Sequence, residues 1–320
     1  MRFTVLALLC AGCHDYGLYR PLSATPGEWR EADEPPLPLQ SPYSSGSQSW
    51  QLSGGAADLL FFGDTSGSMQ PELETLGEEA ESLVAALEAY AIDWQILAVT
   101  GPDGCGNNGV ISADEEDFSA RFAEGLTRPP GADDVDEWGL YNAREAIRMS
   151  EPGRCNEGFL RTGSTLQVVF ISDEDDNSPG WNEGDPDYWQ TYTDEIRWHH
   201  PSDRPVIFSA IAGPDPGGCS GAEPGVGYWQ AAEASEGATL SICDDWSDRL
   251  ELLARLSAMQ RVFVLDERPI PWSISVWVNG EPRSEGWRYV AEDGWLQFDH
   301  SAPLGGDEVL IDYLVRSGPP

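Results

Sequence analysis

Segments of strand length alternate with amphipathic segments over most of this chain. The segments with the apolar character of buried strands are 57–62, 92–100, 166–172, 206–212 and 238–243. Helical spacing of apolar residues predicts helices at 71–90, 115–126, 135–149, 187–198, 226–235 and 246–259. Strands that alternate with helices form a mostly parallel sheet covered on both faces. The pattern therefore predicts an α/β fold with a doubly wound, mostly parallel sheet.

The hydrophobic period changes to two residues near residue 261. Apolar side chains alternate with polar ones from Ile274 onward, and Asn279-Gly280 offers a type I′ turn between two such runs. Asp293-Gly294 offers a second turn. We therefore expect an α/β domain at 55–262 and a small C-terminal antiparallel β unit at 263–320.

The N-terminus has the features of an export signal. Arg2 precedes a short apolar stretch, too short to span a bilayer, and Ala11-Gly12 supply the small residues that a signal peptidase needs. Residues 1–13 resemble a bacterial lipoprotein signal with Cys13 as the lipidated residue; the alternative is ordinary secretion. The Pro-, Ser- and Gly-rich residues 14–54 then predict a flexible tether. We expect an exported protein that touches a membrane only through its lipid, facing the periplasm or the cell surface.

The charge of the chain narrows the classes of partner. The sequence has 55 Asp and Glu against 18 basic residues, all of them Arg, for a net charge of −37. Such a surface repels nucleic acid and favours cations or basic partners. Aromatic residues make up 10% of the chain, which suits a folded protein rather than a disordered one.

Four cysteines remain beyond the N-terminal Cys10 and Cys13. An even number in an exported chain indicates two disulfides, for which three pairings are possible. We favour Cys105–Cys155 and Cys219–Cys243, because each pair would join loops at one end of a sheet. A zinc site is the alternative, although no Cys-x-x-Cys spacing is present.

The residues that follow the first predicted strand suggest a cation site. Asp64, Ser66 and Ser68 form an Asp-x-Ser-x-Ser motif between the strand and the next helix. Carboxylate and hydroxyl oxygens are suitable ligands for Mg²⁺ or Ca²⁺. The motif resembles the metal-ion-dependent adhesion site of the von Willebrand factor type A domain, and the resemblance covers some 200 residues. It implies that these three residues bind one Mg²⁺ or Ca²⁺ ion, and that an acidic group of a partner protein completes the coordination shell.

A second part of the resemblance follows the strand at 166–172. Asp173 occupies the place where the family has an Asp that holds the metal through water, within a more acidic loop than usual. An EF-hand reading of this loop fails, because Ser178 and Gly184 stand where that loop needs Gly and Glu. Asp175 or Asp176 remains a candidate for a second calcium contact.

The third family element, a Thr before the third helix, is missing from its usual place. We prefer Asp134 as the replacement ligand, with Thr127 and Asp133 as alternatives. The aspartates could equally cap the following helix.

These residues favour binding over catalysis. Gly63 to Gly67 does not have the spacing of a serine hydrolase motif, and only four His are present to support a nucleophile. We therefore expect a metal-dependent adhesion protein of the bacterial envelope. The main alternative is a structural module in which metal and disulfides only stabilise the fold; hydrolase or carbohydrate-binding activity is less favoured.

Overall fold

The computed structural model describes residues 43–52, 54–127, 138–180, 184–201, 204–299 and 301–316. Ser45–Arg316 forms one compact unit. The expected signal sequence, Cys13 and most of the expected tether lie outside the described residues. Within the described residues, no helix has the length and apolar character needed to cross a membrane.

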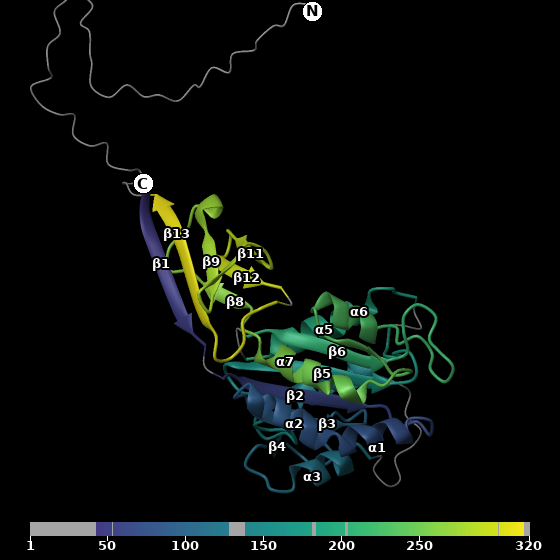
Figure 1. Cartoon of the computed structure of the whole chain (residues 1–320). Helices are drawn as coiled ribbons and strands as arrows, with labels where there is room; N and C mark the ends of the chain where they lie inside the picture. The colour runs from purple at the N-terminus through teal and green to yellow at the C-terminus, as the bar shows by residue number, and fades with distance from the viewer. Residues whose placement is uncertain are drawn as a thin grey trace, which may run out of the picture. The chain divides into compact units, whose positions relative to one another are not determined.

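A six-stranded sheet forms the centre of the α/β part (Figure 1). Its strands, from one edge to the other, are β4 (Ile111–Ser112), β3 (Asp93–Val99), β2 (Ala56–Gly63), β5 (Ser164–Ser172), β6 (Val206–Ala212) and β7 (Thr239–Ser241). All neighbours pair in parallel except β4, which is antiparallel to β3. The predicted fold class, a doubly wound and mostly parallel α/β sheet, is confirmed.

The helices that cover this sheet divide between its two faces. Their bounds are α1 Gln70–Glu78, α2 Ala80–Ala89, α3 Phe118–Gly125, α4 Gly139–Arg148, α5 Tyr188–His199, α6 Tyr228–Ala234 and α7 Leu250–Ala258. In β2, Leu59 and Phe61 pack with α1, α2, α3 and α7, whereas Leu60 and Phe62 pack with α4, α5 and α6. Since successive side chains of a strand point to opposite faces, the continuous apolar run from Leu59 to Phe62 in β2 reflects burial on both sides.

The helix expected at 71–90 is divided in two at Glu79, whose backbone leaves helical geometry. Gly77 lies just before this break and is a weak helix former. A Cβ on Gly77 would stand 2.7 Å from the Cβ of Ala123 on α3. Gly77 therefore permits a close approach of α1 and α3 that the periodicity of α1 alone does not reveal.

The remaining strands form two small sheets. One has the order β1 (Tyr43–Gln51), β13 (Glu308–Arg316), β9 (Ser275–Val278) and β10 (Glu281–Arg283). The other has the order β11 (Trp287–Val290), β12 (Trp295–Phe298) and β8 (Val262–Val264), with antiparallel pairing. Asn279 and Gly280 both have positive φ, at 54° and 78°, as the predicted type I′ turn between β9 and β10 requires.

One sequence expectation changes at the C-terminal end of the tether. Residues 43–51 lie within the expected tether at 14–54, but they form β1 beside β13. Their Ser and Gly content suggested a solvated segment, whereas their alternating half-buried and exposed positions are those of an edge strand. The pairing partner lies over 250 residues away in the sequence, as the hydrogen bond between Ser47 and Asp312 illustrates, so local composition could not indicate it.

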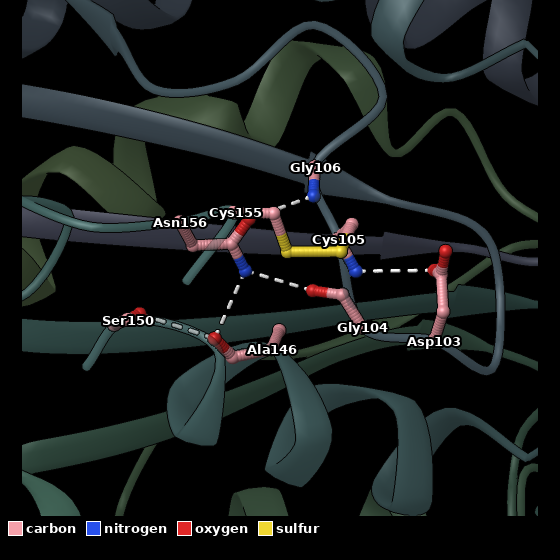
Figure 2. Close-up of a disulfide and its surroundings, with 8 residues drawn as sticks. All are labelled: Asp103, Gly104, Cys105, Gly106, Ala146, Ser150, Cys155 and Asn156. Atoms are coloured by element: carbon pink, nitrogen blue, oxygen red, sulfur yellow. Dashed lines mark hydrogen bonds between the residues drawn. A yellow bond between two sulfur atoms is a disulfide. The ribbon is translucent and has the colours of Figure 1, made fainter. Parts of the chain in front are cut away.

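Both favoured disulfides are present. Figure 2 shows Cys105–Cys155, which joins the loop after β3 to the loop after α4 with a Cα–Cα distance of 5.7 Å. The fully buried Asn156 beside it accepts from Gly106 N at 2.9 Å and donates to Gly104 O and Ala146 O at 2.7 and 3.0 Å. Cys219–Cys243 joins the segments that follow the neighbouring parallel strands β6 and β7.

Candidate functional site

The candidate residues lie where the order of strands reverses. Numbered by chain order within the sheet, the strands run 3-2-1-4-5-6, so the chain leaves β2 towards one edge and reaches the other edge through β5. Ligands of open α/β sheets bind beyond the carboxyl ends of the strands at such a reversal point. The residues after β2 and after β5 occupy this position here.

Asp64 is fixed at the end of β2. Its backbone N donates to Ile171 O at 3.0 Å, which extends the β2–β5 pairing by one residue. The side chain is 5% exposed; Oδ1 accepts from Ser66 N at 2.8 Å, and Oδ2 accepts from Ser172 Oγ at 2.8 Å. The carboxylate thus connects the turn after β2 to the end of β5.

The hydroxyl groups of the two motif serines lie close together. Ser66 Oγ and Ser68 Oγ lie 3.1 Å apart and form a hydrogen bond. Exposure increases along the turn, from the buried Asp64 through the half-buried Ser66 to the exposed Ser68. The turn therefore presents hydroxyl oxygens to solvent above a carboxylate that is held from below.

Asp173 directly follows Ser172, which is itself bonded to Asp64. Its backbone carbonyl accepts from Glu223 N at 2.8 Å, which holds the loop against the segment after β6. Its Oδ1 is buried and has no hydrogen-bond partner in the described structure. Burying a carboxylate oxygen without a hydrogen bond costs free energy, which a bound cation would offset. Oδ1 of Asp173 is therefore a candidate metal ligand.

Asp134, the preferred replacement ligand, and Asp133 both lie outside the described residues. Thr127, the remaining alternative, is exposed, and its Oγ1 donates to Glu124 O at 2.6 Å. That bond ties Thr127 to the end of α3.

Asp176 has a role that the sequence did not reveal. It is fully buried; Oδ1 accepts from Leu140 N at 2.9 Å and from Ser178 Oγ at 2.9 Å, and Oδ2 accepts from Ser178 N at 3.2 Å. Burial raises the pKa of Asp176 from 3.8 to about 7, although these hydrogen bonds act in the opposite direction. Since both oxygens already have protein donors, Asp176 anchors the start of α4 rather than offering a free calcium ligand.

Ser172 is the second residue that the sequence did not single out. It is fully buried at the last position of β5, and its hydroxyl both donates to Asp64 and accepts from Glu174 N at 3.1 Å. The sequence could have indicated it through its position immediately before Asp173, because a hydroxyl at the end of a strand can reach the neighbouring strand of the sheet. Ser172 acts as a positioning residue for Asp64.

The donor set limits what this site can bind. Among the residues that the structure describes, no group of three or more His, Cys, Asp or Glu side chains is placed to hold a metal ion. A cation at this reversal point would therefore depend on the hydroxyls of Ser66 and Ser68 as well as on carboxylates. Such an all-oxygen set suits Mg²⁺ or Ca²⁺ and does not suit zinc.

No protein-family model matches this sequence, and no curated protein is significantly similar to it. Several solved structures are similar in fold. A von Willebrand factor type A structure from Catenulispora acidiphila is 11% identical and covers 87% of this chain, with a TM-score of 0.38. The pilus adhesin SpaC from Lactobacillus rhamnosus GG, in its open conformation, is 9% identical over 86% of this chain, with a TM-score of 0.37.

A third similar structure is the adhesive tip pilin GBS104 from Group B Streptococcus agalactiae, 10% identical over 86% of this chain and 82% of its own, with a TM-score of 0.34. The present chain spans 62% of the Catenulispora structure and 41% of SpaC. Similarity at this level says nothing about ligands, metals or partners.

Proposed function

We propose that this chain is an exported binding protein that holds one divalent cation at the reversal point of its sheet. Asp64, Ser66, Ser68 and Asp173 would hold the ion. An acidic side chain of a partner protein would complete the coordination shell, so that binding depends on Mg²⁺ or Ca²⁺. The protein would act by adhesion and not by catalysis.

The observation that supports this proposal most strongly is the difference in hydrogen bonding between the carboxylates of Asp64 and Asp173. Asp64 is held in place by Ser66 N and Ser172 Oγ, while the buried Oδ1 of the neighbouring Asp173 has no hydrogen-bond partner among the described residues. The two serine hydroxyls lie 3.1 Å apart on the solvent side. Hard divalent cations prefer such oxygen ligands.

The balance of charge explains why a partner would be needed. Hydroxyl ligands are neutral, so they leave the positive charge of the ion only partly compensated. A carboxylate from outside would therefore bind strongly at the exposed side of the ion, next to Ser68. A third carboxylate from this chain, such as Asp134, would reduce that attraction and favour calcium.

Export is supported by the two disulfides, because such bonds persist in oxidising compartments. The lipid anchor on Cys13 remains part of the proposal, since it rests on the N-terminal sequence alone. It would place the protein on a bacterial membrane, facing the periplasm or the cell surface.

The first test is cation binding to the full chain by calorimetry. We expect one Mg²⁺ or Ca²⁺ site in the natural protein, none in Asp64→Ala, and an unchanged site in Asp114→Ala, since Asp114 is an exposed carboxylate in the loop after β4. No binding to the natural protein, or equal binding to both variants, would refute the cation site.

The second test separates adhesion from the structural alternative. The full chain, immobilised, should capture a protein from native envelope or medium with Ca²⁺ or Mg²⁺ present, and lose it with chelator. If Asp64→Ala abolishes capture and leaves the melting temperature unchanged, adhesion is supported. If the substitution only lowers the melting temperature, the cation serves the fold.

A further inference from the structure

Beside the candidate cation site, between α1 and α3, lies a groove of about 880 Å³. The two helices lie side by side on one face of the sheet (Figure 1). The lining of the groove extends from the turn at Thr65 and Ser66 to Glu81 at the start of α2. The groove therefore begins at the turn of the candidate cation site and continues away from it along α1 and α3.

The floor of the groove is apolar. Leu73 of α1 and Leu126 at the end of α3 close it from below, while Ala120 and Ala123 form the α3 wall. Gly77 also lines the groove, where α1 and α3 approach each other closely. A volume of this size is in the range of cavities that enclose a ligand.

The rim of the groove is acidic. Glu74, Glu78, Glu81 and Glu124 are all exposed and line it, and none of the lining residues that the structure describes is basic. Glu74 accepts from Gln70 Nε2 at 2.8 Å, and Glu124 accepts from Asn108 Nδ2 at 3.2 Å. In the described part of the chain, no arginine forms a salt bridge with any of these four glutamates. Among the described residues, these four carboxylates around an apolar floor therefore have no arginine paired with them.

We propose that this groove binds an amphipathic segment of a partner protein, with apolar side chains on the floor and Lys or Arg side chains against the glutamates. Charge complementarity supports this occupant, since a negative rim on a chain of net charge −37 attracts a basic segment and repels an acidic one. An amphipathic helix in an apolar groove is a common mode of peptide recognition. The contact needs no cation, so it is independent of the proposed metal site.

The test uses a fluorescein-labelled helical peptide of about 14 Leu and Lys residues, with a Leu and Gln peptide as its neutral counterpart. Anisotropy is measured on the full chain with chelator present. We expect the Lys peptide to bind and the Gln peptide to bind about tenfold more weakly. We also expect the Lys peptide to lose affinity as salt rises.

Matched variants separate the groove from the general acidity of the surface. The triple variant Glu74→Gln, Glu78→Gln, Glu124→Gln should weaken binding by about tenfold. The control triple Glu281→Gln, Glu285→Gln, Glu292→Gln removes the same charge from exposed sites around β10–β12 and should leave binding within about twofold. Equal losses in the two triples would overturn the proposal, because they would indicate diffuse attraction.

A second pair of variants tests the apolar floor. Ala120→Trp fills the groove and should weaken binding of the Lys peptide by about fivefold. Ala85→Trp changes an exposed alanine of α2 outside the groove and should leave peptide binding unchanged. Unchanged binding to Ala120→Trp would overturn the proposal. So would a dimer in sedimentation that Ala120→Trp dissociates, since a second copy would then occupy the groove. Asp64→Ala should keep peptide binding, which distinguishes this test from that of the cation site.

Discussion

Replacing the buried Asp176 with Asn should remove part of the pH dependence of stability. In the folded protein, burial raises the pKa of this carboxyl from 3.8 to about 7, so Asp176 is protonated in the folded state at pH values where it is ionised in the unfolded state. The folded state therefore binds more protons between these two values, and stability falls as pH rises from about 4 to about 7. Below and above that window, Asp176 contributes no slope.

The magnitude follows from the shift. One pKa unit corresponds to about 1.4 kcal/mol. Between about pH 5 and the folded pKa of about 7 lie about two units, so the ionisation of Asp176 should lower the unfolding free energy by about 3 kcal/mol by about pH 8. Asn cannot ionise, so the variant avoids this loss. Its amide would face Ser178 N, which now donates to Oδ2 at 3.2 Å, and the lost bond should cost a constant 1–3 kcal/mol, roughly, at every pH.

The assay is urea unfolding followed by Trp fluorescence at several pH values between about 5 and 8. The difference in unfolding free energy, variant minus natural protein, should rise with pH by about 3 kcal/mol over this range. For the control Asp114→Asn, at an exposed site, the unfolding free energy should change with pH in the same way as that of the natural protein. Parallel pH curves for Asp176→Asn and the natural protein would refute the argument that burial controls this carboxyl.

Three further outcomes can be measured by urea or thermal unfolding. Replacing Cys105 and Cys155 together with Ser should lower the unfolding free energy by about 4 kcal/mol, as the chain-entropy relation gives for a separation of 50 residues; no change would contradict that relation. Arg161→Ala should cost about 3–5 kcal/mol, because the fully buried Asp58 loses the guanidinium that lies 2.7 Å away; a loss below about 1 kcal/mol would show that the pair is dispensable. Gly77→Ala should cost about 1–3 kcal/mol, since the new methyl meets α3, whereas a more stable variant would show that the helices can separate at no cost.

Hydrophobic periodicity by itself determined the α/β class and most elements of the sheet. β2 and β5 are buried on both faces, so each contains a continuous apolar run, 59–62 in β2 and 168–171 in β5, shortly before a polar turn. The type I′ turn was predictable because Asn279 and Gly280 tolerate positive φ. These features depend on neighbours in the sequence, which is why the sequence was sufficient.

Only part of the candidate site could be predicted from local sequence patterns. The spacing of Asp64, Ser66 and Ser68 is local, so the motif could be recognised without a structure. The bond from Ser172 to Asp64 spans 108 residues, and it exists because β2 and β5 are neighbours at the reversal point of the sheet. No local pattern contains that neighbour relation.

Tertiary structure alone decided the roles of Asp176 and of residues 43–51. Asp176 stands in an acidic run that suggested a calcium contact, yet it is fully buried and accepts a hydrogen bond from Leu140 N at the start of α4. Residues 43–51 suggested a tether, yet β13 provides a strand beside which they pair. In both cases the deciding partner lies far away in the sequence, and burial and hydrogen bonding depend on what lies nearby in space.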